Sequence, residues 1–573
     1  MSEITIPVRR KRNFLSDDFK VETWEGIEQY YKLLLNREIN NVDEFKKWLL
    51  DRSELESVLE EDSGWRYIKM TCYTEDEAYR DSFNYYISEI EPNVAPLANE
   101  LDKKVLACQY LDQLEGEGYD LLRKKLKTNS EIFREESIPL FTEMQSAQQD
   151  YGKVIAAMTV TVDGKELTLQ QAGVLLQSTD RALRETIYKQ IQSRRLDDKV
   201  ELDNLLTKLI NLRDQVAKQA GFTNYRDYMF AAMGRYDYTP QDCFDFHDAI
   251  AKEVVPILNQ VSKERKESLQ LSQLRPWDLA VDPKNLPALK PFDSGNDLLE
   301  KTIECFDRLD PYLGNCLKTM KAMEHLDLES RKGKSPGGYN YPLDEIGVPF
   351  IFMNATSTLQ DLITMIHEGG HAVQSFLTIP LELGLHRELT SEIAELASMS
   401  MELITMDHWD IFFPKPNDLK RAKKEHLEHI MDTLPWVATI DKYQHWLYEN
   451  PIHSQEERNA AWNEIHSKFA STEIDWTGLE NFKTNIWQRQ LHIYEVPFYY
   501  IEYGMAQLGA IAVWKNYTEN PQKALQDYMK ALSLGYSKSI KNVYATAGIK
   551  FDFSAEYIKK LMDFVKAELK KCE

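Results

Sequence analysis

Three features are scarce in this chain: cysteine, long apolar runs and clustered basic residues. The six cysteines among 573 residues are scattered with no C-x-x-C pair, which excludes a zinc ribbon and a disulfide framework. No apolar run approaches the ~20 residues of a membrane helix, and residues 1–20 lack the apolar core of a signal peptide. The formal net charge of −23 argues against general nucleic-acid binding. We therefore expect a soluble cytoplasmic protein with no nucleic-acid or membrane partner.

The spacing of apolar residues is mostly helical. Alternating runs are few, and the strand candidates are residues 338–341 and 348–353. Residues 274–297 contain four prolines and read as an extended loop rather than a domain linker. The fold prediction is therefore a mainly α chain with one small β-sheet beside the segment that follows residue 353.

That segment carries an H-E-x-x-H motif at residues 367–371, a pattern that can bind zinc and supply a base. On a helix, His367 and His371 lie one turn apart on one face, so both imidazoles can reach one ion. Glu368 is rotated by about 100° from His367, a position for a base rather than a third ligand. A catalytic zinc usually has three protein ligands, so one more must come from elsewhere in the chain.

The sequence around the motif predicts a helix. Ser357 followed by Gln360 indicates a capping box at its start. Apolar residues recur at helical spacing at Leu359, Leu362, Ile363, Ile366, Val373 and Phe376. Gly369 and Gly370 each destabilise a helix interior by about 0.5–1 kcal/mol. Two adjacent glycines indicate that another element approaches the helix backbone there.

Carboxylates downstream of the motif are candidates for the third ligand. They are spaced to lie near one helical face, at Glu388, Glu392, Glu395 and Glu402. Small residues on the same segment would allow close packing against the two glycines, and these are Ala394, Ala397 and Ser398. Spacing alone does not choose among the four carboxylates.

The motif by itself leaves several protein classes open. A metzincin would need glycine at position 374 and histidine at 377, but the chain has Gln374 and Leu377, which excludes that class. An aminopeptidase should carry a G-x-M-E-N segment before the motif, and none is present. A carboxypeptidase of a related helical architecture and a non-enzymatic helical scaffold with a degenerate site both remain open.

Several further segments resemble one peptidase family. The matching stretches are residues 180–185, 213–218, 276–279, 336–339 and, most specifically, 395–402. From about residue 176 to near its C-terminus, the chain resembles the oligoendopeptidase F and Pz-peptidase branch of the M3-type, thimet-oligopeptidase-like metallopeptidases.

This resemblance implies a complete metal site. Glu395 matches the third zinc ligand of the family, 24 positions beyond His371, and would join His367 and His371 around one zinc ion per chain. Glu392 and Glu402 are then candidates to orient a ligand histidine through its other nitrogen.

The resemblance also implies a wall opposite the zinc helix. His492 matches a family histidine that leans over the scissile bond, and Tyr499 and Tyr503 are the chosen catalytic tyrosines. Pro497 is the predicted first residue of their helix, which leaves His492 on the preceding loop. The substrate-binding candidates are Gly337, Gly338, Tyr339 and Tyr500. A strand near the motif would hold the peptide by its main chain.

The implied protein is a zinc-dependent endopeptidase that cleaves internal bonds of short oligopeptides. Residues 1–175 would form an N-terminal helical lobe and residues 176–573 the catalytic region, closing together over a deep channel. Glu368 would take a proton from a water activated by zinc and deliver it to the leaving amine. Zinc, a tyrosine or His492 would stabilise the oxyanion. No feature of the sequence predicts an oligomeric state.

Overall fold

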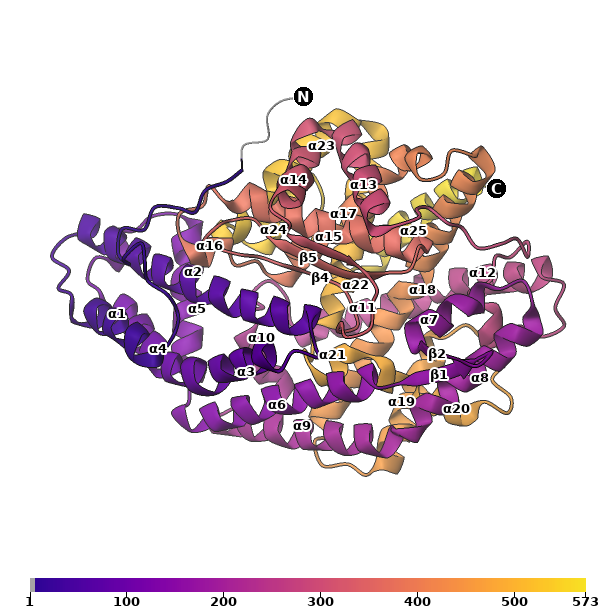
Figure 1. Cartoon of the computed structure of the whole chain (residues 1–573), viewed down its shortest axis with the longest axis horizontal. Helices are drawn as coiled ribbons and strands as arrows, with labels where there is room; N and C mark the ends of the chain where they lie inside the picture. The colour runs from indigo at the N-terminus through magenta and orange to yellow at the C-terminus, as the bar shows by residue number, and fades with distance from the viewer. Residues whose placement is uncertain (1–5, 573) are drawn as a thin grey trace.

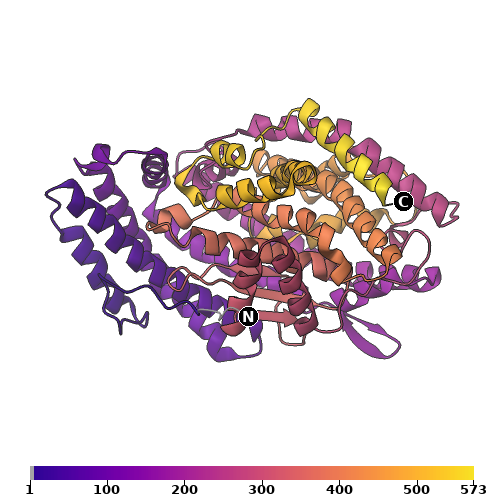
Figure 2. The same ribbon diagram turned by 90° about the horizontal axis from the view of Figure 1, so that it is seen from above.

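Helices form most of the molecule, as the apolar spacing predicts (Figure 1). The computed structural model describes residues 6–572. The N-terminal helices gather at one end of the molecule in both views (Figures 1 and 2). They are α1 (Trp24–Asn36), α2 (Val42–Cys72), α3 (Glu77–Tyr85), α4 (Glu91–Ala107) and α5 (Glu117–Ile132).

This N-terminal group of helices has a hydrophobic core of its own. Its buried apolar residues run from Leu15 to Leu126, and Leu383 joins them from a distant part of the chain. The next helix, α6 (Ile138–Ala156), packs instead into the main core through residues such as Met144. The N-terminal core therefore ends before residue 175, the predicted limit of the N-terminal lobe.

At the centre of the main core, α17 (Ser391–Ile404) packs on both α15 (Leu359–Thr378) and α22 (Tyr500–Glu519). The remaining helices follow α6 in the chain. They are α7 (Leu169–Val174), α8 (Arg181–Asp197), α9 (Lys199–Gln219), α10 (Tyr225–Ala232), α11 (Pro240–Glu253), α12 (Val255–Ser268), α13 (Gly295–Leu309), α14 (Pro311–Ala322), α15 (Leu359–Thr378), α16 (Gly384–Arg387), α17 (Ser391–Ile404), α18 (Pro416–Glu449), α19 (Gln455–Phe469), α20 (Glu480–Asn485), α21 (Leu491–Tyr494), α22 (Tyr500–Glu519), α23 (Pro521–Leu532), α24 (Ile540–Thr546) and α25 (Ala555–Lys571). No helix within residues 6–572 combines the length and apolar character needed to span a bilayer.

Within residues 6–572, two small sheets complete the fold. A hairpin, which was not predicted, pairs β1 (Thr159–Val162) with β2 (Lys165–Thr168). The second sheet has the order β3-β5-β4, with β3 (Leu326–Glu329), β4 (Tyr339–Tyr341) and β5 (Phe350–Ala355). β5 runs parallel to β3 and antiparallel to β4. β4 and β5 confirm the two predicted strands, while β3 was not predicted.

The motif helix α15 forms where predicted, but its capping box lies one residue further along. Thr358, not Ser357, is the N-cap: its hydroxyl accepts a hydrogen bond from the amide of Asp361. The Asp361 carboxylate in turn accepts from the amide of Thr358. Ser357 has a φ of 69°, a left-handed conformation that turns the chain into the helix and leaves Gln360 out of the cap. The predicted Ser357–Gln360 box is therefore wrong by one position.

The two glycines of α15 face different neighbours. A Cβ on Gly370 would lie 2.6 Å from Cα of Ser398 and 2.9 Å from the carbonyl oxygen of Ala397, so the backbones of α15 and α17 nearly touch here. A Cβ on Gly369 would instead lie 2.8 Å from the ring of Phe306 on α13. The predicted packing against α17 is confirmed for Gly370 and wrong for Gly369.

Candidate metal centre and active site

The proposed ligands His367, His371 and Glu395 come together between α15 and α17. Each offers one ligand atom, and these atoms all lie within 4.8 Å of one another. Glu395 Oε2 lies 3.2 Å from His367 Nε2 and 3.7 Å from His371 Nε2. Zinc binds nitrogen and carboxylate oxygen at about 2.0–2.2 Å, so two nitrogens and one oxygen this close together fit a single ion.

Neighbouring side chains orient these groups. His367 Nδ1 shares a hydrogen bond of 2.6 Å with Glu402 Oε1, and a proton on Nδ1 leaves Nε2 free as a ligand. The hydroxyl of Ser398 donates to Glu395 Oε2 at 3.1 Å. His426 Nε2, from α18, lies 3.6 Å from Glu402 Oε2. The ligand set therefore rests on a layer of buried polar side chains contributed by α17 and α18.

Burial and charge shift the pKa values of the ligands in different directions. Burial lowers the pKa of His371 to about 4. Burial also opposes protonation of His367, but Glu395 and Glu402 outweigh it and raise its pKa well above the ordinary value. For Glu395, burial is outweighed by the two histidines, which lower its pKa to about 2. Glu395 is thus held as a carboxylate, the form that binds metals.

Glu368 lies beside the ligands and borders the same cavity. Its side chain is buried, and burial raises its pKa to about 7. The β4 segment contacts this part of α15: the side-chain Nδ2 of Asn340 donates to the main-chain carbonyl oxygen of Glu368 at 3.4 Å. A carboxyl group near neutral pKa at the edge of a cavity can both take and give a proton.

A cavity of about 850 Å³ opens in front of the ligands. Its lining includes Gly338, Tyr339 and Asn340 of the β4 segment on one side and Tyr499 and Tyr503 on the other, but not Gly337. β4 is an edge strand of the three-stranded sheet. An edge strand offers unpaired N–H and C=O groups, so β4 can pair with an extended peptide.

The segment that carries His492, Tyr499 and Tyr503 has helix boundaries that differ from the prediction. α22 begins at Tyr500 rather than Pro497, because Phe498 has a φ of 69° that breaks the helix before it. The predicted helix start at Pro497 is therefore wrong. His492 lies in the short helix α21 rather than on a loop.

Of the residues in this segment that were predicted to act in catalysis or binding, only some lie near the metal ligands. Tyr499 donates a hydrogen bond of 2.7 Å to Glu395 Oε1. His492 lies behind the tyrosines: its Nε2 is 3.3 Å from Tyr503 Oη, and burial lowers its pKa to about 4. Tyr500 packs against His492, with 4.8 Å between ring centroids. Neither His492 nor Tyr500 belongs to the cavity lining, so the structure does not bring Tyr500 to the predicted substrate position.

Two of the four downstream glutamates, Glu388 and Glu392, do not contact the motif histidines within residues 6–572. Glu388 precedes α17 and pairs with Lys125, so it does not share a helical face with the others. Glu392 accepts a hydrogen bond of 2.6 Å from Tyr238, and within residues 6–572 no hydrogen bond or ion pair joins it to a motif histidine. Three residues on a helix span about 300°, so Glu392 lies about 60° around α17 from Glu395 and nearly one turn closer to its N-terminus, where it meets Tyr238 rather than the ligands. Its predicted role of orienting a ligand is therefore wrong.

Two buried residues near the site were not predicted. His426 approaches Glu402 from 24 positions downstream, and Arg213 donates to the carbonyl oxygens of Ile493 and Tyr494, which fixes the short helix that bears His492. Each sits on a helix with ordinary apolar spacing. No local sequence signal marks His426. Arg213 begins the stretch 213–218 that resembles the family, but its role could not be predicted, because its partners lie far away along the chain.

Comparison with known proteins identifies the family of the chain. The family described as "Peptidase family M3" matches residues 174–563, and the "Peptidase M3 N-terminal domain" matches residues 14–133. The chain belongs to peptidase family M3. Membership in this family makes it a metalloendopeptidase, which confirms the predicted resemblance and enzyme class.

Relatives of this M3 peptidase share nearly its whole length. An oligoendopeptidase F homolog of Borreliella burgdorferi is 22% identical over 559 residues, which cover 92% of this chain and 90% of the relative. The solved structure of Pz peptidase A with an inhibitor has a TM-score of 0.92 at 26% identity and covers 97% of this chain and 99% of its own. A solved structure of an oligoendopeptidase F has a TM-score of 0.91 at 26% identity, and the match covers 98% of this chain and 99% of that one. The mainly α fold prediction is confirmed.

Proposed function

We propose that the chain is a zinc-dependent endopeptidase that hydrolyses internal bonds of short oligopeptides. One observation carries the proposal. The atoms of His367, His371 and Glu395 cluster within 4.8 Å, and Glu368 borders the same cavity as these ligands. Bound there, one zinc ion would supply Lewis-acid chemistry, polarising a water and the scissile carbonyl.

Glu368 is the proposed general base and, later, the general acid. Its position beside the ligand pair allows its carboxylate to take a proton from the attacking water. The same carboxyl group would then give this proton to the leaving amine, which must be protonated before it departs. Because Glu368 is buried, bulk water would compete little for the proton during this transfer.

The two cavity tyrosines have different proposed roles. Tyr499 holds Glu395 by a hydrogen bond, so its hydroxyl is already engaged and it positions a ligand. Tyr503 lines the cavity and has His492 behind its hydroxyl, so it is the better donor to the oxyanion of the scissile carbonyl. His492 would then act by positioning Tyr503.

The substrate would bind as an added strand. β4 is an edge strand, and its residues Tyr339 and Asn340 line the cavity in front of the ligands. Main-chain pairing with β4 would hold an extended peptide regardless of its side chains. The relatives' names, oligoendopeptidase F, support short peptides as substrates.

The decisive test is Glu368→Gln, assayed on a quenched fluorescent peptide blocked at both ends. We expect kcat to fall by about 10²–10⁴-fold, the usual contribution of a positioned base, while the metal content stays at the wild-type level. Glu89→Gln, on an exposed position, is the matched control and should retain full activity. Wild-type turnover in Glu368→Gln would remove this residue from the mechanism.

The same peptide decides between endopeptidase and carboxypeptidase. Internal cleavage of a peptide blocked at both ends requires an endopeptidase, whereas a carboxypeptidase needs a free C-terminal carboxylate. Cleavage only after the C-terminal block is removed would favour the carboxypeptidase. Mass spectrometry of the products gives the answer directly.

A further inference from the structure

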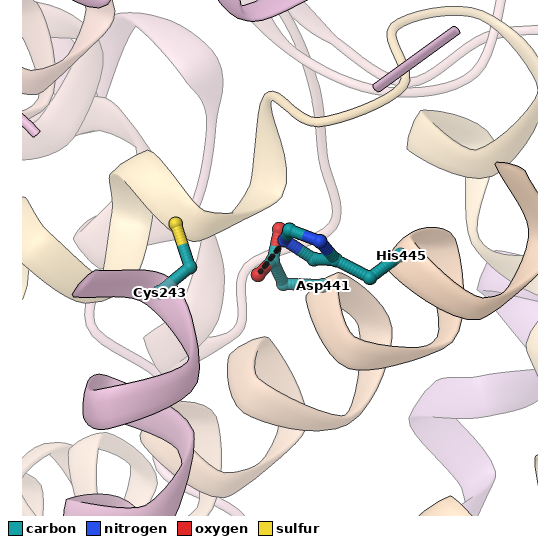
Figure 3. A group of neighbouring side chains, drawn as sticks. All are labelled: Cys243, Asp441 and His445. Atoms are coloured by element: carbon teal, nitrogen blue, oxygen red, sulfur yellow. Dashed lines mark ion pairs between the residues drawn. The ribbon is translucent and has the colours of Figure 1, made fainter. Parts of the chain in front are cut away.

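A second group of potential metal ligands lies between α11 and α18, away from the catalytic cavity. Cys243 and His247 are spaced one turn apart on α11, and Asp441 and His445 are spaced one turn apart on α18. Figure 3 shows Cys243 on one helix and Asp441 with His445 on the other. None of these four residues lines the cavity in front of His367.

The geometry of this group matches that of a metal site. The ligand atoms of Cys243, Asp441 and His445 all lie within 4.8 Å of one another. Zinc binds sulfur at about 2.3 Å and nitrogen or oxygen at about 2.0–2.2 Å, so ligand atoms of one ion lie at most about 4.5 Å apart. A small movement of side chains is enough to bring all three onto one ion.

Burial makes the group unusual. Cys243 and Asp441 are 0% exposed and His445 is 1% exposed. Within residues 6–572, neither ring nitrogen of His445 makes a hydrogen bond, although its Nε2 lies 3.3 Å from Asp441 Oδ2 in the ion pair drawn in Figure 3, and Asp441 Oδ1 has no hydrogen-bond partner. An unsatisfied buried polar atom costs about 1–3 kcal/mol, so native proteins rarely leave several side by side without an occupant.

The surroundings leave few other partners for His445. The ring of Phe244 lies 4.7 Å from its ring and that of Phe498 lies 5.4 Å away, centroid to centroid. Phe230 closes a third side at 6.3 Å. An apolar shell of this kind excludes solvent and strengthens metal–ligand bonds.

His247 completes the arrangement. Its Nε2 lies 2.8 Å from Asp441 Oδ2 in a hydrogen bond between two side chains that are both fully buried. Oδ2 therefore faces both His247 and His445, while Oδ1 has no hydrogen-bond partner among residues 6–572. Histidine N–H groups commonly hold metal-binding carboxylates in this way.

We propose that Cys243, Asp441 and His445 form a second, structural site for a divalent transition metal ion of the zinc type, with His247 holding Asp441 in place. The mixture of thiolate, imidazole and carboxylate suits zinc better than magnesium or calcium, which prefer oxygen alone. Cys243 binds as the thiolate, and its proton leaves to solvent as the ion enters. The site ties α11 to α18.

The proposed site also contacts the segment that carries the active-site residue Tyr499. His445 packs on Phe498, and the amide of Phe498 donates to Gln444, the neighbour of His445 on α18. Phe498 directly precedes Tyr499, which bonds the catalytic ligand Glu395. A metal ion at His445 therefore fixes the base of the turn from which Tyr499 projects.

Cobalt distinguishes the two sites, because only this one contains sulfur. The full chain carrying His367→Ala and His371→Ala is expressed in cobalt-supplemented medium, since a buried site loads during folding. We expect one cobalt ion per chain and a near-ultraviolet thiolate-to-cobalt absorption band. Adding Cys243→Ala should abolish both signals, while adding Cys305→Ala, at another fully buried cysteine, should leave both unchanged.

The outcomes separate the proposal from its alternatives. A folded His367→Ala/His371→Ala protein with no bound metal and no thiolate band would overturn it, and the group would then be a metal-free ion-pair network. This measurement stands even if Cys243→Ala fails to fold. Wild-type protein grown with zinc should hold two ions per chain by mass spectrometry; one ion, lost on His367→Ala/His371→Ala, would also refute the second site. The result does not depend on catalysis.

Discussion

At the scale of single residues, Glu402 contacts the proposed zinc ligands through His367 alone among residues 6–572. Its carboxylate fixes the Nδ1 proton and thereby presents Nε2 to the ion. We expect Glu402→Gln to weaken zinc binding by about 10–100-fold, the usual effect of removing such a partner. Competition with a chromogenic chelator measures the affinity. Glu388→Gln, on an exposed neighbour outside α17, should bind zinc normally; an unchanged affinity in Glu402→Gln would contradict the assigned role.

Glu495, next to the helix that bears His492, should make stability depend on pH. Burial raises its pKa from 4.5 to about 7, although Arg213 opposes this shift. The folded state therefore binds the proton more tightly than the unfolded state. This bound proton therefore stabilises the folded state fully below about pH 4.5, and that stabilisation is lost as the pH rises through 7.

We expect Glu495→Gln to remove this fall in the free energy of unfolding, because glutamine does not ionise. Relative to wild type, the variant should gain on the order of 1–3 kcal/mol at pH 8 and little near pH 5. Urea denaturation at both pH values gives the free energies of unfolding. Glu136→Gln, at an exposed position, should change neither value. Equal effects of Glu495→Gln at the two pH values would show that the carboxyl group is not perturbed by the fold.

The residues of the site differ in how far a sequence can predict them. The spacing of His367 and His371 predicts that they share a helical face, because helix geometry is local. Spacing could not separate Glu395 from Glu392, because which face of α17 meets α15 depends on packing between helices. His426 could not be predicted at all, since it meets Glu402 only through the placement of α18.

At the scale of elements, the close contact of α15 and α17 depends on Gly370. A Cβ there would lie 2.6 Å from the backbone of Ser398, so the helices would have to separate. We expect Gly370→Ala to destabilise the protein by about 1–3 kcal/mol, as overpacking does, and to weaken zinc binding because Glu395 moves with α17. Thermal unfolding and chelator competition measure the two effects.

Gly152 provides the matched control for this prediction. It also lies within a helix, but a Cβ added there would meet nothing within 4 Å. Gly152→Ala should therefore stabilise the protein by about 0.4–1 kcal/mol, through the lower entropy of the unfolded chain. If Gly370→Ala were as stable as Gly152→Ala, the close approach of the two helices would not be the reason for the glycine.

Three elements near the site were predicted from local patterns, whereas β3, which pairs at a distance, and the local β1–β2 hairpin were missed. α15, β4 and β5 follow from apolar spacing and length. β3 is short and pairs in parallel with β5, more than twenty residues later, so its local sequence carries little signal. The start of α22 was misplaced because the left-handed turn at Phe498 is fixed by Arg235 and Gln444, which contact its backbone.

At the scale of the whole molecule, the cavity lies between the N-terminal helices and the catalytic region. Its lining includes Arg52 and Glu56 of α2 as well as His367 and Glu368 of α15. We propose that the helices before α6 and the region from α6 onward act as two lobes around bound peptide, which moves the boundary from the predicted residue 175 to the end of the N-terminal core. The two lobes also contact each other directly, for example where the amide of Ser539 donates a hydrogen bond to Glu117 of α5.

A substrate site enclosed in this way should reject folded proteins. A peptide must reach β4 in extended form, and a folded domain cannot offer an extended segment without unfolding. We therefore compare one cleavable sequence as a free peptide and as an internal segment of a small stable domain. A domain stable by about 5–10 kcal/mol is unfolded to only ~1 part in 10⁴ or less, so we expect cleavage to slow by at least about 10³-fold.

Mass spectrometry of timed samples measures both rates. A destabilised variant of the same domain is the control, and its cleavage rate should rise in proportion to its unfolded fraction, because proteolysis then follows the population of the open chain. Rapid cleavage of the stable domain at the same bond would mean that the lobes admit folded chains. In that case the peptide would bind at an open surface rather than between the lobes, and pairing with β4 would not limit the choice of substrate.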